Sequence, residues 1–144
     1  MKYVSFDVDG VLVDSTSRLL LCQNGNEVDW DCFLDCGKLF MDKPKATNIE
    51  LLNLLVKRGF GILIVTGRRE YMRDCTLAQL LSYGVTGIRG LFMRPNDNDE
   101  PDATYKSSTL VRLSRDFNIL VHFDDNPSTV MEVVKHGIDA VLIS

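Results

Sequence analysis

Short, mostly continuous apolar runs alternate along the chain with stretches whose apolar residues repeat at helical spacing. Such runs are typical of strands buried on both faces of a parallel sheet. Strands are predicted at residues 3–6, 62–65, 88–93, 119–123 and 140–143. Helices are predicted at residues 48–58, 76–83, 107–117 and 127–135. The alternation favours one α/β domain over residues 1–144, with a five-stranded, mostly parallel sheet in a three-layer α/β/α sandwich.

Residues 11–45, called the flap below, interrupt this alternation beside the first strand. Residues 18–22 are predicted to form a strand, 23–26 a hairpin turn and 30–39 a short helix. The flap also holds Trp30, Phe33 and Phe40. These aromatic side chains either offer a surface on which bases stack or pack the flap against the core, and packing is the commoner use.

Composition narrows the class of protein. The chain has 45% hydrophobic and 25% charged residues and no apolar run long enough to span a membrane. With no signal-peptide pattern at its start, a cytoplasmic chain without a membrane partner is expected. The net charge of −4 gives no overall attraction to nucleic acid, so a polyanion would need a local basic cluster.

The four cysteines do not form paired Cys-x-x-Cys units, and the two histidines lie far from them. A zinc site is therefore disfavoured. In a reducing compartment we expect four thiols that pack mostly as small hydrophobic groups.

Asp7 and Asp9 follow the first strand in the segment Asp7-Val8-Asp9-Gly10. Alternate residues of an extended segment point to the same side, so both carboxylates should face one pocket. One carboxylate of such a pair can act as a nucleophile while the other transfers a proton. The same pattern also occurs in calcium loops and in plain strand-to-turn junctions.

Three further strand ends or helix starts carry polar groups, and the carboxyl ends of parallel strands meet at one edge of a sheet. Thr66 and Gly67, with free backbone N–H groups, suit phosphate oxygens. Lys106 can neutralise a transferring phosphoryl group, and Asp124 and Asp125 offer the oxygen ligands that Mg²⁺ prefers. Each also has an ordinary interpretation: a turn, a surface lysine, and a cluster that caps a helix.

In order, and across nearly the whole chain, these four segments resemble the four motifs of the haloacid dehalogenase (HAD) superfamily. The resemblance implies a Rossmann-like HAD fold. Asp9 is an acidic residue two positions after Asp7, and in this it resembles the phosphatases and phosphotransferases of the superfamily. The resemblance further implies that Asp7 attacks phosphorus to give an aspartyl-phosphate, and that Asp9 protonates the leaving oxygen and then activates water. Thr66 and Lys106 would bind the phosphoryl oxygens.

The same resemblance implies a Mg²⁺ cofactor held by Asp7, the Asp9 carbonyl and Asp124, with Asp125 supporting the ion or its waters. Members of the superfamily select substrates with a cap domain inserted between motifs. Neither interval in this chain has room for a full cap, so an open site is expected. An open site fits a large substrate, or one enclosed by a second copy of the chain in a homo-oligomer.

Residues 91–94, the acidic loop that follows and Lys106 resemble the phosphatase half of bacteriophage polynucleotide kinase-phosphatases. Arg18 and Arg68 also fall where that family places arginines. The resemblance implies removal of a 3′-phosphate from a nucleotide or nucleic-acid end. Arg18, Arg68 and Arg94 would contact the substrate phosphate or order the site.

Arg94 has an equally good structural interpretation, in which it pairs with Asp97 or Asp102 and holds the loop. The chain also departs from that family, since it has no phosphate-binding loop of a kinase and no arginine between the loop aspartates. Two other functions stay open. One is a phosphatase for a small phosphorylated metabolite, and the other is an inactive HAD-like binding protein, although no motif residue is lost.

Overall fold

One parallel sheet of five strands forms the centre of the computed structural model, which describes residues 1–144. The strands are, in chain order, β1 (Lys2–Phe6), β6 (Gly61–Arg69), β7 (Ile88–Arg94), β8 (Asn118–Asp124) and β9 (Ala140–Leu142). Their order in the sheet is β7-β6-β1-β8-β9, and every neighbouring pair is parallel. The predicted strands and their parallel arrangement are confirmed.

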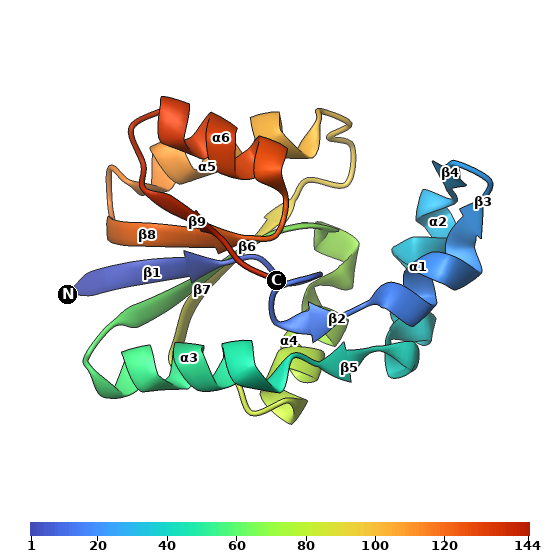
Figure 1. Cartoon of the computed structure of the whole chain (residues 1–144), viewed down its shortest axis with the longest axis horizontal. Helices are drawn as coiled ribbons and strands as arrows, with labels where there is room; N and C mark the ends of the chain where they lie inside the picture. Colours follow the sequence, from blue (N-terminus) through green and yellow to red (C-terminus); the bar gives the residue numbers. More distant parts are fainter.

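Two pairs of helices cover the two faces of this sheet (Figure 1). α3 (Ala46–Lys57) and α4 (Arg73–Ser82) lie on one face, and α5 (Asp102–Leu113) and α6 (Pro127–Lys135) lie on the other. The three-layer α/β/α sandwich is therefore confirmed. The main departure is α5, which begins at Asp102 rather than Ser107 and so brings the loop acid Asp102 onto the helix.

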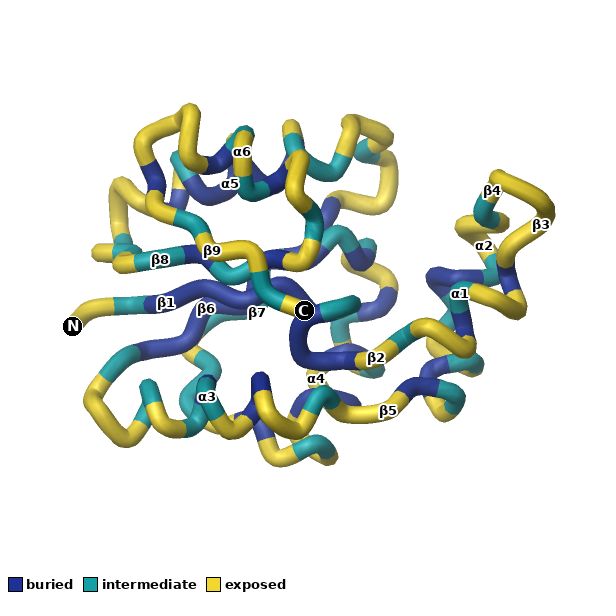
Figure 2. The backbone as a smooth tube through the Cα atoms, in the orientation of Figure 1, coloured by how far each residue is buried: buried dark blue, intermediate teal, exposed yellow.

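The central strands are the most deeply buried part of the chain (Figure 2). Val4 and Phe6 of β1 are buried together with Ile62 and Ile64 of β6 in one apolar cluster. Burial on both faces explains why these strands have continuous apolar runs rather than an alternating pattern. The polar residues that follow them are consequently held on a rigid platform.

The flap projects beyond the carboxyl ends of the strands (Figure 1). Its base is an antiparallel pair, β2 (Val13–Asp14) with β5 (Lys43–Pro44). Beyond the base lie α1 (Thr16–Cys22), the hairpin of β3 (Gln23–Asn24) and β4 (Glu27–Val28), α2 (Trp30–Phe33) and the 3-10 helix η1 (Cys36–Met41). A second 3-10 helix, η2 (Glu70–Met72), leads from β6 into α4.

The flap departs from the sequence prediction in two places. The strand predicted at 18–22 is wrong, because these residues lie in helix α1. The helix predicted at 30–39 is divided into α2 and η1, and Asp29 and Asp35 each cap one of the two pieces. The predicted hairpin turn is confirmed, and Gly25 supplies the left-handed backbone there with φ of +64°.

The prediction of four free thiols is wrong, since all four cysteines are paired. Cys22–Cys32 joins α1 to α2 within the flap, and Cys36–Cys75 ties η1 of the flap to α4 of the core. Both disulfides thus fix the flap, one internally and one against the sandwich. As for membranes, none of the helices has the length and apolar character needed to cross one.

Candidate active site

Asp7 and Asp9 leave β1 at the carboxyl edge of the sheet. The Asp7 N–H donates to the carbonyl of Phe123 on β8 at 3.0 Å, which carries the β1–β8 pairing one residue past the strand. Gly10 then turns the chain with φ of +85°. A Cβ at Gly10 would lie 1.9 Å from the Asp125 Oδ2 atom, so only glycine lets Asp125 approach this turn.

Three carboxylates converge beside this turn. One oxygen each of Asp7, Asp124 and Asp125 lies within 4.8 Å of the others. Burial, with the nearby acids, raises the pKa of Asp7 well above its usual value, although the Lys106 ammonium opposes the shift. Burial and the Asp124 charge also raise the pKa of Asp125. Such mutual repulsion between hard oxygen ligands is relieved by a divalent cation, so the residues present fit a Mg²⁺ site.

Lys106 lies in the second turn of α5 and joins the two acidic strand ends. Its Nζ atom is 3.1 Å from Asp7 Oδ2, 3.0 Å from Asp124 Oδ2 and 2.9 Å from Asp102 Oδ2. Burial lowers the pKa of Lys106, but these carboxylates outweigh it and raise the pKa well above the ordinary value. The lysine is therefore a fixed cation at the place where anionic oxygens would collect.

A buried chain of polar side chains holds Asp124 from behind. The Ser5 hydroxyl lies 2.8 Å from His122 Nδ1, and His122 Nε2 lies 2.9 Å from Asp124 Oδ2. Burial lowers the pKa of His122, which favours the neutral ring. For Asp124, burial raises the pKa, but the hydrogen bond from His122 and the Lys106 charge outweigh it and leave a pKa of about 2. Ser5 and His122 were not predicted from the sequence as site residues. The one sign of them there is that each is a polar residue within an apolar strand.

Asp9 is clamped by two buried guanidinium groups. Arg68 binds both oxygens of Asp9, with Nε 3.0 Å from Oδ2 and Nη2 2.9 Å from Oδ1. Arg18 Nη2 donates to Asp9 Oδ1 at 2.7 Å. Burial raises the pKa of Asp9, but Arg68 and Arg18 outweigh it and lower the pKa to about 2. Asp9 is thus held ionised in the free protein.

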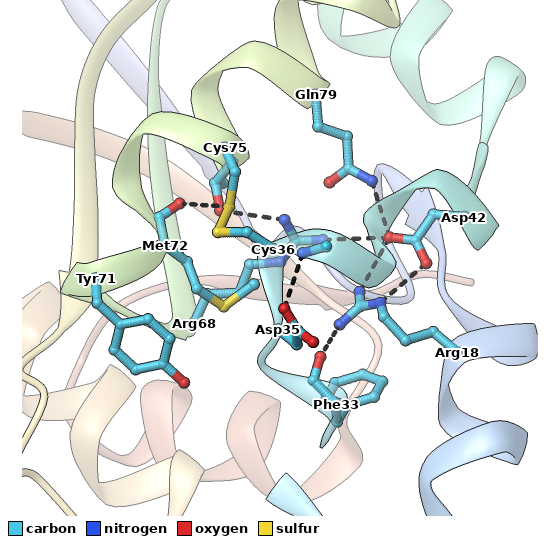
Figure 3. Close-up of a disulfide and its surroundings, with 12 residues drawn as sticks. Arg18, Phe33, Asp35, Cys36, Asp42, Arg68, Tyr71, Met72, Cys75 and Gln79 are labelled. Atoms are coloured by element: carbon cyan, nitrogen blue, oxygen red, sulfur yellow. Dashed lines mark hydrogen bonds and ion pairs between the residues drawn. A yellow bond between two sulfur atoms is a disulfide. The ribbon is translucent and has the colours of Figure 1, made fainter. Parts of the chain in front are cut away.

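A second carboxylate, Asp42, lies behind the clamp and was not anticipated from the sequence. Its side chain is fully buried and accepts from Arg18 Nε at 3.0 Å and from Gln79 Nε2 at 2.8 Å. Arg68 Nη2 lies 3.6 Å from its Oδ2 atom. Figure 3 shows the Asp42 carboxylate among these groups, next to the Cys36–Cys75 disulfide. Two arginines and two aspartates thereby form a quartet whose formal charges balance, and Asp9 is its one partly exposed member.

Thr66 and Gly67 lie in β6 rather than in a turn after it. The pairing of β6 with β7 shifts register between Thr66 and Arg69, so the two residues between them bulge at the strand end. The Thr66 hydroxyl accepts the Arg68 N–H at 3.1 Å. A Cβ at Gly67 would lie 2.6 Å from Asp102 Oδ1, so this glycine allows the bulge to approach α5 closely.

Arg94, at the end of β7, is bound on several sides. Nη1 donates to Asn98 Oδ1 at 3.1 Å and to the Glu100 carbonyl at 2.6 Å, and Nη2 donates to Asp102 Oδ1 at 3.1 Å. Its guanidinium also lies 4.8 Å from the centre of the Tyr105 ring. These contacts are the ones expected of a loop-holding residue, with Asp102 rather than Asp97 as the acidic partner.

The sequence-predicted site residues share one open cavity of about 1140 Å³. Eight of them line it: Asp7, Asp9, Thr66, Gly67, Arg68, Arg94, Lys106 and Asp125. Arg18 and Asp124 lie directly behind this lining, on Asp9 and Lys106 respectively. The geometry brings together a buried carboxylate, an ionised second carboxylate, a fixed cation and a cluster of carboxylates that suits a cation. This arrangement is suited to transfer of a phosphoryl group.

Solved structures with this fold include phosphatases. A chain of the Pnkp1/Rnl/Hen1 complex superposes with a TM-score of 0.78 at 18% identity, over 99% of this chain and 45% of that chain. A class C acid phosphatase from Bacillus anthracis gives 0.66 at 14% identity, over 93% and 59%. The haloacid dehalogenase-like hydrolase SP0104 from Streptococcus pneumoniae gives 0.71 at 12% identity, over 100% and 85%. The protein thus spans less than half of the Pnkp1 complex chain, and these likenesses establish the fold.

Comparison at the level of sequence families is more specific. No curated protein sequence matches the chain. The family description that matches is the HAD superfamily, subfamily IIIB (acid phosphatase), and it aligns with residues 1–140. That range contains all four motif segments, from Asp7 to Asp125. The chain therefore belongs to the HAD superfamily, subfamily IIIB (acid phosphatase).

Proposed function

We propose that this phosphatase is a Mg²⁺-dependent phosphomonoesterase that removes a 3′-phosphate from nucleotide or polynucleotide ends. The observation that carries the proposal is the convergence of Asp7, Asp124 and Asp125 around the fixed ammonium of Lys106. A buried carboxylate beside both a cation and a candidate metal cluster is suited to attack an anionic phosphate. Without those positive charges, the nucleophile and the substrate would repel each other.

In the proposed reaction an Asp7 oxygen bonds to phosphorus while the bond from phosphorus to the leaving oxygen breaks. Asp9 donates a proton to that oxygen, and the product is an aspartyl-phosphate on Asp7 and an alcohol. Asp9 then accepts a proton from water, and the water oxygen bonds to phosphorus. The bond from phosphorus to the Asp7 oxygen breaks, which releases inorganic phosphate and regenerates Asp7. Lys106 and the Thr66 hydroxyl bind phosphoryl oxygens during both steps.

The contacts of Arg68 and Arg18 with Asp9 are consistent with the two proposed roles of Asp9, as proton donor and as proton acceptor. Arg68 and Arg18 keep Asp9 ionised, the state required to accept a proton from water in the second step. An incoming phosphate dianion adds negative charge beside Asp9 and Arg68, both of which line the cavity. Its arrival therefore raises the proton affinity of Asp9 and prepares the first step.

The metal proposal rests on the three convergent carboxylates. Asp7, the Asp9 carbonyl and Asp124 would hold Mg²⁺, with Asp125 supporting it. When bound, the ion offsets the charge of the phosphoryl group and of the nucleophile. The repulsion that raises the pKa of Asp7 and Asp125 would then be balanced.

The substrate proposal rests on the open cavity, the motif resemblance and one structural neighbour. Another structure with this fold, at a TM-score of 0.78, is named the Pnkp1/Rnl/Hen1 RNA repair complex. A cavity of about 1140 Å³ without a covering cap exceeds what a phosphoryl group alone requires. The alternative is a small phosphorylated metabolite enclosed by a second copy of the chain.

Phosphate release by the purified protein with Mg²⁺ tests this proposal. We expect 3′-phosphorylated oligonucleotides and 3′-nucleotides to be cleaved faster than 5′-nucleotides and sugar phosphates, and chelation of Mg²⁺ to stop the reaction. Asp7→Asn should reduce turnover by at least about a thousandfold. Asp139→Asn, at an exposed carboxylate outside the cavity, is the matched control. Full turnover by Asp7→Asn would exclude the aspartyl-phosphate, and preference for sugar phosphates would favour the metabolite alternative.

We also propose the cytoplasmic location that is expected from the sequence. The two disulfides set a condition on it, because structural disulfides are rare in reducing compartments. Trapping of thiols at the moment of cell lysis measures the paired state directly. Four free thiols would agree with a cytoplasmic protein, and none would place the chain in an oxidising compartment.

A further inference from the structure

The apolar part of the active-site cavity comes from one element. Four large apolar side chains line the cavity, and all belong to the flap: Leu19, Trp30, Phe33 and Leu34. The remaining lining consists of charged and polar residues with a few glycines and prolines, among them Lys45, Asp99 and Asn126. A ligand whose phosphoryl group lies at Asp7 therefore meets apolar surface only on the flap side.

Within this apolar wall, Trp30 offers the accessible surface. Trp30 is 59% exposed, whereas Phe33 and Leu34 are 8% and 9% exposed and belong to the packed interior of the flap. Trp30 is the one exposed member of these four apolar side chains. The two aromatic residues of the cavity wall thus differ: Phe33 packs inside the flap, and Trp30 is exposed.

The Trp30 ring is held in place before any ligand arrives. Its ring centre lies 5.9 Å from that of Phe33 in an edge-to-face arrangement at 83°. Phe33 in turn lies beneath the Arg18 guanidinium, 4.2 Å from the ring centre, and Arg18 binds Asp9. The Cys22–Cys32 disulfide fixes α2, which begins at Trp30, to α1. A surface fixed in this way costs little conformational entropy on binding.

We propose that the exposed Trp30 ring is the stacking surface for the nucleobase of the substrate's leaving group. The inference rests on the proposed function, since it assumes a phosphoryl group at Asp7. A single flat aromatic face, with polar surface on the other sides of the cavity, suits a planar base on a polar sugar. It suits a sugar phosphate or an aliphatic phosphate less well, and stacking on every base makes the contact independent of sequence.

The chain provides a direct spectroscopic test, because Trp30 is its only tryptophan. We expect the Asp7→Asn variant to bind substrate without consuming it. We expect a nucleoside 3′-monophosphate to quench the tryptophan fluorescence in a saturable manner. Glycerol 2-phosphate has no base. Calorimetry should detect its binding, but the tryptophan fluorescence should not be quenched. Nucleotide binding with unchanged fluorescence would overturn the inference.

Kinetics of Trp30→Ala provide the second test. We expect KM for a nucleoside 3′-monophosphate to rise about tenfold, as for loss of one base-aromatic stack, with kcat nearly unchanged. KM for glycerol 2-phosphate should stay within about twofold, and Trp30→Phe should retain most of the affinity. An equal rise of KM for both substrates would show that Trp30 only supports the flap.

Phe40→Ala is the matched control for these measurements. Phe40 is an aromatic residue of the same flap and is 84% exposed, but it does not line the cavity. Neither KM nor fluorescence quenching should change in this variant. If the wild type hydrolyses no phosphomonoester, the proposed function fails. Quenching in Asp7→Asn still reports on Trp30 separately in that case.

Discussion

Arg94 illustrates how contacts decide between two roles at the scale of a residue. Its guanidinium binds Asn98, Glu100 and Asp102, and Asp102 binds Lys106. We expect Arg94→Ala to lower the free energy of unfolding by about 1–3 kcal/mol, because several part-buried acceptors lose their donor. Turnover should fall as well, since Lys106 loses a positioned partner. Thermal denaturation and initial rates measure both effects, and lost turnover with an unchanged melting temperature would instead indicate direct substrate contact.

Asp9 gives a prediction on pH. Its pKa is about 2 in the folded protein and 3.8 when unperturbed, so its ionised form stabilises the fold. This contribution is complete above the unperturbed value and is lost as the pH falls toward the folded value. The difference corresponds to about 2 kcal/mol. We expect the stability advantage of wild type over Asp9→Asn to shrink by this amount between about pH 5 and pH 2.

Denaturant titration in buffer free of divalent ions measures that advantage at each pH. The Asp139→Asn variant, whose carboxylate lies at the surface, should differ from wild type by a constant amount. An equally constant difference for Asp9→Asn would mean that the arginines do not favour ionised Asp9.

The candidate site residues Asp7, Asp9 and Asp125 were predictable from the sequence because each follows a strand and parallel strands end at one edge. The residues behind them were not predictable. Asp42 contacts Arg18 across 24 residues of sequence, and Ser5 contacts His122 across 117. Nothing local marks these polar groups as partners, since their pairing depends on tertiary packing.

Among the elements, the bulge at the end of β6 has a strict steric requirement. An alanine Cβ at Gly67 would meet Asp102 Oδ1 at 2.6 Å, and the Asp102 side chain would have to move away. We expect Gly67→Ala to reduce turnover about tenfold or more, because Asp102 also holds Lys106. Initial rates at saturating and at subsaturating substrate concentrations measure the loss of turnover.

Gly59→Ala is the control for that substitution. Gly59 has φ of +94° but no atom within 4 Å of an added Cβ, and it lies far from the site at the end of α3. We expect it to cost about 1 kcal/mol of stability through backbone strain, with turnover unchanged. Equal turnover losses in both variants would imply a general effect of replacing glycine.

The two disulfides of the flap allow a comparison of loop lengths. Cys36–Cys75 closes a loop of 39 residues and Cys22–Cys32 one of 10. Loop entropy predicts that Cys36→Ser/Cys75→Ser loses about 1 kcal/mol more stability than Cys22→Ser/Cys32→Ser. Chemical denaturation under oxidising conditions measures the difference, and it should vanish with reductant. An equal cost would mean that local contacts, not chain entropy, determine the effect.

Helix α1 shows why the flap was the part of the fold that was hardest to predict from the sequence. Leu19, Leu20 and Leu21 form a short apolar run that fits a strand as well as a helix. Leu20 and Leu21 are exposed, so burial does not determine their conformation. The central strands β1 and β6 were predictable because their continuous apolar runs coincide with burial.

For the whole molecule, the acidic cluster should couple stability to a divalent cation. Binding to the folded state alone stabilises by about 2.7 kcal/mol at a cation concentration one hundred times Kd. We expect Mg²⁺ to raise the melting temperature of wild type but to have little effect on Asp124→Asn, which loses a carboxylate of the cluster. A scan of melting temperature against Mg²⁺ concentration, with Asp139→Asn as control, measures the coupling. Equal shifts in all three proteins would indicate nonspecific binding.

The charge quartet has a consequence for exchange of the flap. Arg18 and Asp42 come from the flap, whereas Asp9 and Arg68 come from the sandwich, so each part contributes one positive and one negative charge. Because each part is balanced by itself, exchange of the whole flap leaves no uncompensated charge in the interior. A chain built in this manner can exchange its flap by recombination while Asp7 and Asp9 remain unchanged.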